Sequence, residues 1–167
     1  MGKLALTSLA VAVLVLTGCS QKSPEVDMTK ASADTKGAGV DDGMSALQKL
    51  IASLEANSKK IYFDFDKYNV KKDQQSNIDA DAALFNSAEA KSFSIKVEGN
   101  CDEFGTDEYN YALGLKRAKS VKDALVAKGM SADRLTVVSY GESNPACTEH
   151  NKECWAKNRR AEFKVLP

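Results

Sequence analysis

The hydrophobic pattern divides the chain into three parts. A nearly continuous apolar run, Leu4 to Leu16, follows a single lysine and ends close to Cys19. A polar stretch without aromatic residues or hydrophobic periodicity covers residues 20 to about 43. From about residue 45 onwards, apolar positions recur at the spacings of helices and strands. The pattern therefore predicts a targeting segment, a flexible linker and a folded region.

The folded region begins with a short amphipathic helix, predicted over 45–56. Its apolar residues recur at three- and four-residue spacing, and they are Met44, Leu47, Leu50, Ile51 and Leu54. We expect this segment, taken as 45–57, either to dock on the domain that follows or to form a surface for a partner.

Residues 58–167 are expected to form one domain in which strands alternate with helices. The predicted strands are 60–65, 92–98, 135–140 and 162–166, and the predicted helices are 71–86 and 108–128. Gly129 follows the second helix at the position where glycine commonly ends one. The polar connection 142–158 has room for one helical turn. This alternation predicts an α/β sandwich, in which helices cover a sheet.

The start of the chain predicts a secretory signal peptide over residues 1–18. Its apolar run of about 13 residues is shorter than the roughly 20 that cross a bilayer as a helix. The ending Leu16-Thr17-Gly18-Cys19 resembles a bacterial lipobox, in which the cysteine is lipidated and becomes the mature N-terminus. The alternative is an ordinary signal peptide with an incidental cysteine. Residues 19–44 are then the lipidated N-terminus and linker, and Ser20 favours sorting to the outer membrane of a Gram-negative bacterium.

Charge and composition exclude several classes of partner. Lys plus Arg and Asp plus Glu both number 23, so the formal net charge is zero, whereas nucleic-acid-binding domains usually carry a basic excess. The single histidine leaves little room for a His-rich metal site. We therefore expect no nucleic acid, no metal and no cofactor.

Several spaced motifs occur in order between residues 60 and 166. They are Tyr62-Phe63-Asp64-Phe65-Asp66, Val97-Glu98-Gly99-Asn100-Cys101-Asp102-Glu103-Phe104-Gly105-Thr106, Glu108-Tyr109-Asn110, Ala112-Leu113-Gly114, Arg117-Ala118, Val138-Ser139-Tyr140-Gly141-Glu142 and Asn158-Arg159-Arg160-Ala161. This set resembles the OmpA-like peptidoglycan-binding domains. With the lipobox and the linker, it is similar to the lipoprotein branch that belongs to the Tol–Pal system. The resemblance implies a βαβαβ(α)β domain, a two-layer sandwich with a mixed four-stranded sheet. It also implies a non-enzymatic lipoprotein that tethers the outer membrane to peptidoglycan and engages the Tol system's periplasmic β-propeller protein.

The resemblance further implies a site for the meso-diaminopimelate of peptidoglycan stem peptides. That side chain ends in an ammonium and a carboxylate on one carbon, so its binder needs an acceptor and a donor close together. Asp102 would accept the ammonium, and Arg117 would hold the carboxylate, because its planar fork binds carboxylates bidentately. The alternative is an ordinary ion pair or cap formed by these two residues.

Four other residues complete the near side of the predicted site. Asn110 and Leu113 lie on the same helical face as Arg117, at spacings of seven and four. Asp66 and Tyr68 follow the first strand, and in the family this loop borders the same pocket. Tyr68 is either a wall of the pocket or a surface residue.

The closing motif and two departures from the family pattern add further expectations. Asn158 and Arg159 match the closing motif, and each either braces the loop or touches the ligand. Cys101 stands where the family commonly has Thr, and a thiol forms weaker hydrogen bonds than a hydroxyl. Phe104 stands where many relatives have Arg, which removes a positive charge or replaces it with packing.

The remaining cysteines are expected to be of two kinds. Cys147 and Cys154 are seven residues apart, and a local disulfide is expected because a secreted chain meets an oxidising compartment. His150 lies between them, so a zinc site that includes Cys101 is the alternative, although the spacing matches no standard ligand pattern. Cys101 is then either buried and inert or exposed at the pocket and oxidisable.

Two enzymatic hypotheses stand beside the binding hypothesis. An envelope hydrolase would use two of Asp64, Asp66, Asp102 and Glu103 as an acid/base pair. The chain shows no Ser–His or Cys–His arrangement for a nucleophile. A thiol oxidoreductase would be built on Cys101, which is not part of a Cys-x-x-Cys motif.

Overall fold

The computed structural model describes residues 40–167. The predicted signal peptide, the lipidation site Cys19 and the linker up to residue 39 lie outside the described residues. Between Val40 and Pro167, no helix is both long enough and apolar enough to cross a membrane.

Four strands form one mixed sheet in the order β1-β4-β2-β3. They are β1 (Ile61–Tyr62), β2 (Ser94–Asn100), β3 (Leu135–Gly141) and β4 (Arg160–Leu166). β2 pairs with β3 in parallel, while β4 runs antiparallel to both β1 and β2. The sheet confirms the predicted mixed four-stranded arrangement.

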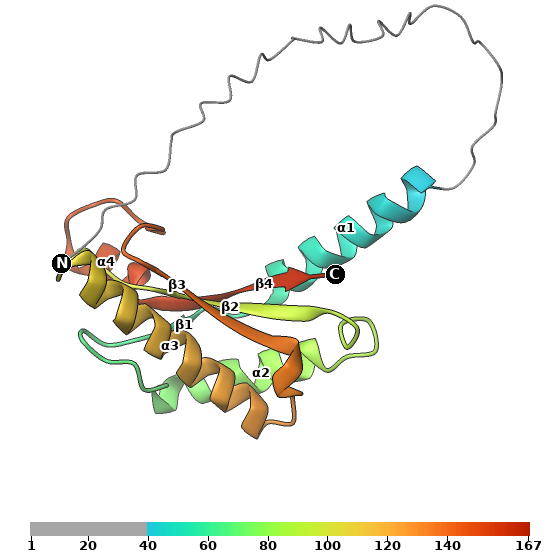
Figure 1. Ribbon diagram of the computed structural model, residues 1–167, viewed down its shortest axis with the longest axis horizontal. Coiled ribbons are helices and arrows are strands. Elements are labelled where there is room, and N and C mark those ends of the chain that lie inside the picture. The colour runs from blue at the N-terminus through green and yellow to red at the C-terminus, as the bar shows by residue number, and fades with distance from the viewer. Residues whose placement is uncertain (1–39) are drawn as a thin grey trace, which may run out of the picture. The chain divides into compact units, whose positions relative to one another are not determined.

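Helices connect the strands, and the larger ones after β1 pack on one face of the sheet. They are α1 (Val40–Asn57), the 3₁₀ turn Lys72–Gln74, α2 (Gln75–Phe85), α3 (Asp107–Ala127), the 3₁₀ turn Ala132–Arg134 and α4 (Lys152–Asn158). Figure 1 shows α2 and α3 on the same side of the strands, with α3 running beneath β2 and β3. The fold is therefore the expected α/β sandwich.

Alternating side chains explain why the sheet has one covered face. Along β2, Ile95 and Val97 are fully buried, and in β4 Phe163 and Val165 are buried opposite them. The intervening positions carry charges, including Lys96, whose ammonium lies 2.9 Å from the Glu98 carboxylate. This period-2 alternation places the core between the sheet and its helices and leaves the other face polar.

Both ends of α3 have the capping groups that its sequence provides. The Thr106 side chain accepts a hydrogen bond from the Tyr109 N–H at 3.2 Å, and thereby caps the N-terminus. At the other end Gly129 has φ +92°, and the Met130 N–H donates to Leu125 O at 3.1 Å. This is a Schellman motif, so the predicted role of Gly129 is confirmed.

Two glycines allow α3 to approach β2 unusually closely. A Cβ at Gly99 would overlap the Gly114 carbonyl oxygen, and a Cβ at Gly114 would overlap the Ser139 hydroxyl. Only residues without side chains fit this crossing. The close contact brings the next turn of α3, which carries Arg117, under the exit of β2.

Several element boundaries differ from the predictions. β1 covers only two of the residues predicted in 60–65, because the chain turns at Asp66 (φ 57°) and the Lys67 N–H donates to Asp64 O. β2 begins two residues later than predicted, and β4 begins two residues earlier than predicted. α1 begins at Val40 rather than 45, since its helix continues through Gly43. Glycine costs a helix only about 1 kcal/mol, which other contributions can offset.

α1 docks on the domain. Leu54 is buried in the core, and Leu50 and Ile51 pack against it. The Glu55 carboxylate accepts a hydrogen bond from the Val165 N–H at 2.9 Å and lies 3.0 Å from the Lys164 ammonium. Of the two expectations for this helix, docking is therefore the one that the structure shows for its C-terminal half.

Asp81 of α2 is a buried carboxylate that should make stability pH-dependent. Its Oδ1 accepts a hydrogen bond from the Lys59 N–H at 2.7 Å, while Oδ2 is buried without a partner. Burial is the main cause that raises the pKa of Asp81 from an ordinary 3.8 to about 7. The folded state therefore binds more protons than the unfolded state between about pH 4 and pH 7, and stability falls as pH rises through that window.

We predict that Asp81→Asn removes this pH dependence. Relative to the variant, the wild type should lose about 2–3 kcal/mol of unfolding free energy between pH 5 and pH 8. Urea unfolding of both proteins at several pH values measures the difference, and the shared titrating groups cancel. A difference that stays constant over this range would contradict the prediction.

Candidate functional site

Asp102 lies in the loop that leaves β2, at the end of the sheet where β2 and β3 terminate. Its side chain is almost completely buried, and its Oδ2 accepts a hydrogen bond from Arg159 Nη1 at 2.9 Å. Within residues 40–167, the other carboxylate oxygen has no protein donor. Asp102 is thus held by one guanidinium and keeps one oxygen free for another donor.

Arg117 lies beneath this loop and joins three segments of the chain. Its side chain is fully buried. Nε donates to Lys67 O at 2.9 Å, Nη1 donates to Asn100 O at 2.8 Å, and Nη2 donates to Asp64 O at 3.3 Å. Nη1 also lies 3.3 Å from Cys101 Sγ. These bonds compensate the burial of a charged group, and they connect the loop after β1 to the exit of β2.

The engagement of Arg117 differs from the predicted bidentate clamp. Four N–H donors of the guanidinium already have partners within the protein, and an Arg has five in total. A two-bond clamp on a ligand would therefore require existing bonds to break. In the structure Arg117 contributes position and positive charge behind Asp102, and burial is the main cause that lowers its pKa from the ordinary value.

Asp66 and Tyr109 close the near side of the site. Asp66 adopts a left-handed conformation (φ 57°), which is uncommon for a residue other than glycine. Its carboxylate accepts a hydrogen bond from the Tyr109 hydroxyl. This bond is the main cause that raises the pKa of Tyr109, so the phenol stays a neutral donor. The strained backbone and the hydrogen bond together fix the position of the Asp66 carboxylate at the surface near Asp102.

Two adjoining hollows occupy the surface above Asp102. The first has a volume of about 220 Å³ and is lined by Phe65, Asp66, Asp102, Phe104, Gly105, Tyr109 and Leu113. The second has a volume of about 250 Å³ and is lined by Asp66, Tyr68, Tyr109, Ala112, Leu113 and Lys116. They share three residues, so we treat them as one cleft. The structure thus brings together four predicted site residues, namely Asp66, Tyr68, Asp102 and Leu113.

Tyr68 forms part of the wall of this cleft. Its side chain is 43% exposed, and the Lys116 ammonium lies 5.5 Å from its ring centroid. That distance allows a cation–π contact. Of the two sequence interpretations of Tyr68, the structure therefore matches the pocket wall.

Asn110 is a brace beneath the cleft. It is fully buried, and its Nδ2 donates to the Glu142 carboxylate and, at 3.4 Å, to Asp102 O. Its Oδ1 is buried without a partner. Asn110 does not line either hollow, so it orients the loop of Asp102 from below.

Asn158 and Arg159 are adjacent in sequence but serve different parts of the structure. Asn158 Oδ1 accepts hydrogen bonds from the Ala146 and Cys147 N–H groups at 2.9 and 3.0 Å. Arg159 donates to Asp102 and, through Nε, to Phe63 O at 3.2 Å. Asn158 therefore braces the loop before α4, while Arg159 supports the cleft.

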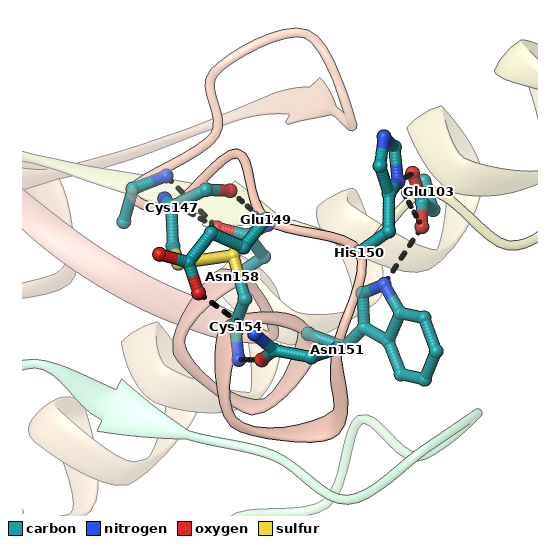
Figure 2. Close-up of a disulfide and its surroundings, with 9 residues drawn as sticks. Glu103, Cys147, Glu149, His150, Asn151, Cys154 and Asn158 are labelled. Atoms are coloured by element: carbon teal, nitrogen blue, oxygen red, sulfur yellow. Dashed lines mark hydrogen bonds and ion pairs between the residues drawn. A yellow bond between two sulfur atoms is a disulfide. The ribbon is translucent and has the colours of Figure 1, made fainter.

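The predicted disulfide between Cys147 and Cys154 is confirmed, with a Cα–Cα distance of 5.3 Å. Figure 2 shows Asn158 beside this bond, and Asn151 accepting a hydrogen bond from the Cys154 N–H at the start of α4. The zinc hypothesis is wrong, because both sulfurs are used in the disulfide. His150 instead points to Glu103, with Nδ1 2.7 Å from the carboxylate.

Cys101 is buried, which is one of the two states expected for it. Its side chain is 2% exposed, and its Sγ donates to Asn110 O at 3.3 Å. Burial is the main cause that raises the pKa of Cys101 to about 11. Thiol chemistry requires the thiolate, so the oxidoreductase hypothesis loses its reactive group.

Sequence reasoning did not name six of the residues that line the cleft as site residues, namely Phe65, Phe104, Gly105, Tyr109, Ala112 and Lys116. Tyr109 and Gly105 belong to the motifs but were not assigned to the site, and Lys116 directly precedes Arg117. The aromatic residue next to Asn110 was a usable signal, because helical spacing places Tyr109 and Leu113 on neighbouring positions of one face. The left-handed Gly105 (φ 123°) could not be read from the sequence pattern.

Comparisons with known proteins identify relatives of this chain. The model of the OmpA family matches residues 62–159. The peptidoglycan-associated lipoprotein of Pasteurella multocida is 40% identical over 95% of this chain and 94% of the relative, and that of Haemophilus influenzae is 45% identical over 66% and 71%. The crystal structure of the peptidoglycan-associated lipoprotein from Burkholderia pseudomallei is 37% identical, covers 65% of this chain and 90% of its own, and superposes with a TM-score of 0.61. The chain belongs to the OmpA family.

Proposed function

We propose that the chain is an outer-membrane lipoprotein that binds peptidoglycan non-covalently through the diaminopimelate of its stem peptides. In this proposal Cys19 carries the lipid anchor, residues 19–39 and α1 lead to the binding domain, and the protein works within the Tol–Pal system. The relatives named peptidoglycan-associated lipoprotein support this function. A lipid anchor and a wall-binding domain on one chain tether the outer membrane to the cell wall.

The cleft around Asp102 is the observation that carries the proposal. The free oxygen of Asp102 and the Asp66 carboxylate offer acceptors for an ammonium. Arg117 and Arg159 lie behind Asp102 and supply positive charge for a carboxylate. Leu113 provides apolar contact for the methylene chain between the two ends of diaminopimelate. The arrangement therefore complements a zwitterion.

The carboxylates support binding more than catalysis. A general acid needs a raised pKa at neutral pH, but hydrogen bonds from His150 and Trp155 lower the pKa of Glu103. One oxygen of Asp102 is occupied by Arg159. We therefore propose a binding protein rather than an envelope hydrolase. We also propose, from the relatives alone, that the Tol system's periplasmic β-propeller protein is a partner.

Co-sedimentation with two kinds of cell wall tests the proposal. The full chain in detergent should sediment with sacculi that contain diaminopimelate, and it should stay in solution with sacculi that contain lysine instead. Lysine retains the ammonium but lacks the carboxylate, so the comparison isolates recognition of the zwitterion. Equal sedimentation with both would contradict the proposed ligand. New muropeptides after incubation would favour the hydrolase.

A further inference from the structure

Three aromatic side chains from three separate segments form a continuous row. Phe65 comes from the loop after β1, Phe104 from the loop after β2, and Trp155 from α4. The ring centroids of Phe65 and Phe104 are 5.9 Å apart, and those of Phe104 and Trp155 are 4.7 Å apart. Both pairs are edge-to-face, a favourable geometry for aromatic rings. We call these three residues the aromatic row.

The aromatic row is exposed although the chain buries its other phenylalanines. Phe65 is 60% exposed and Phe104 is 44% exposed, and Trp155 is partly exposed. A contiguous exposed apolar patch commonly marks a binding surface. Phe65 and Phe104 also line the hollow above Asp102. The row therefore begins in the cleft and extends outward from it towards α4.

Polar groups stand at the outer end of the row. The indole Nε1 of Trp155 donates to Glu103 Oε1 at 2.7 Å, and His150 Nδ1 lies 2.9 Å from the same oxygen (Figure 2). The His150 side chain is 80% exposed. Its other ring nitrogen is free to bond a ligand, as far as residues 40–167 show. An aromatic surface thus ends at a carboxylate and an imidazole.

This combination fits a sugar ring better than an apolar side chain. A pyranose presents apolar C–H groups on its face and hydroxyl or amide groups at its edge. Its face can stack on aromatic rings while its edge bonds to Glu103 and His150. A purely apolar partner would remove water from these two polar groups and offer no hydrogen bonds in its place. Burying polar groups in this way is costly.

We propose that the aromatic row binds an amino-sugar ring of the glycan strand, next to the stem peptide held in the cleft. This inference rests on the proposed function and adds a carbohydrate subsite to it. The stem-peptide segment that joins diaminopimelate to the sugar spans roughly 10 Å when extended. The ring centroids along the row are separated by 5.9 and 4.7 Å, distances that this segment can span. A peptide anchored at Asp102 can therefore place its sugar on the row.

Trp155 makes the proposal directly testable, because the chain contains one tryptophan. The full chain is titrated with a disaccharide–tetrapeptide and with the same tetrapeptide without sugars. The sugar-bearing ligand should bind about tenfold more tightly and should shift the fluorescence emission of Trp155. The free tetrapeptide should bind without that shift.

Two variants separate stacking from general effects on folding. Trp155→Ala should abolish the tenfold preference, as measured by calorimetry, and thermal unfolding shows whether it remains folded. Tyr111→Ala is the matched control, since Tyr111 is an exposed aromatic residue (56%) outside the row, and it should retain the preference. The emission of the wild type needs no variant, so the test does not depend on the stability of Trp155→Ala.

The outcomes distinguish the two proposals. Equal affinity of the wild type for both ligands, with unchanged Trp155 emission, would overturn the carbohydrate subsite and leave the diaminopimelate site intact. A preference that survives in Trp155→Ala would also overturn the subsite. Failure of both ligands to bind would overturn the proposed function and the subsite with it.

Discussion

Asp102→Asn is expected to lower affinity for diaminopimelate-containing sacculi by about tenfold to a hundredfold. Asn has the same shape as Asp but no charge, so it loses the charge-assisted hydrogen bond to the ligand ammonium. Such bonds contribute about 1.5–3 kcal/mol, which corresponds to that range of affinity. Co-sedimentation at increasing amounts of sacculi measures the change.

A matched control separates this effect from a general loss of negative charge. Asp123 lies on the same α3 that carries Arg117, is well exposed, and among residues 40–167 pairs only with Lys119 across one helical turn. Asp123→Asn should therefore bind sacculi as the wild type does. Because Asp102 also pairs with Arg159, the thermal stability of Asp102→Asn is measured in parallel. Normal binding by a folded Asp102→Asn would remove Asp102 from the site.

The fold could be predicted from the sequence because its pattern and its local signals agree. The alternation of Ile95 and Val97 with polar residues defines β2, and Gly129 ends α3 where expected. The boundaries that differ from the predictions are set by tertiary contacts. β1 ends early because the loop after it turns at Asp66 and is held by Arg117, and nothing in residues 60–65 signals that contact.

Four of the predicted site residues line the cleft, but the sequence does not show how deep each predicted residue lies. Helical spacing places Asn110, Leu113 and Arg117 on one face, and in the structure all three are buried on the inner side of α3. Spacing cannot show that Leu113 reaches the cleft whereas Asn110 and Arg117 lie beneath it. That difference arises from the close crossing at Gly99 and Gly114, which is a tertiary contact.

The aromatic row is a second feature that depends on tertiary contacts and could not be predicted from the sequence. Phe104 is notable in the sequence only as an uncharged residue where many relatives carry Arg. Its ring contacts Phe65 and Trp155, which are 39 residues before it and 51 residues after it along the chain. A sequence without coordinates cannot bring these three rings together, so the surface they form had no signal.

Arg117→Lys is expected to destabilise the folded domain by about 3–5 kcal/mol, because it leaves two or three buried carbonyl groups without a donor at a cost of about 1–3 kcal/mol each. Lysine keeps the charge, but its ammonium is a point donor that cannot bond simultaneously to Lys67 O, Asn100 O and Asp64 O. A domain of this size has about 5–15 kcal/mol of stability in total, so the variant should unfold at much lower urea concentration. Urea unfolding of the full chain measures this change.

The same variant decides how Arg117 serves the cleft. Lys119→Arg is the control on the exposed side of α3, and it should change stability by less than about 0.5 kcal/mol. If Arg117→Lys is destabilised as expected, binding to sacculi should fall because the loop of Asp102 is no longer held in position. Lowering the temperature should then restore part of the lost binding. If Arg117→Lys keeps wild-type stability but loses binding completely, the guanidinium contacts the ligand carboxylate directly. The positioning role inferred from its four internal bonds would then be wrong.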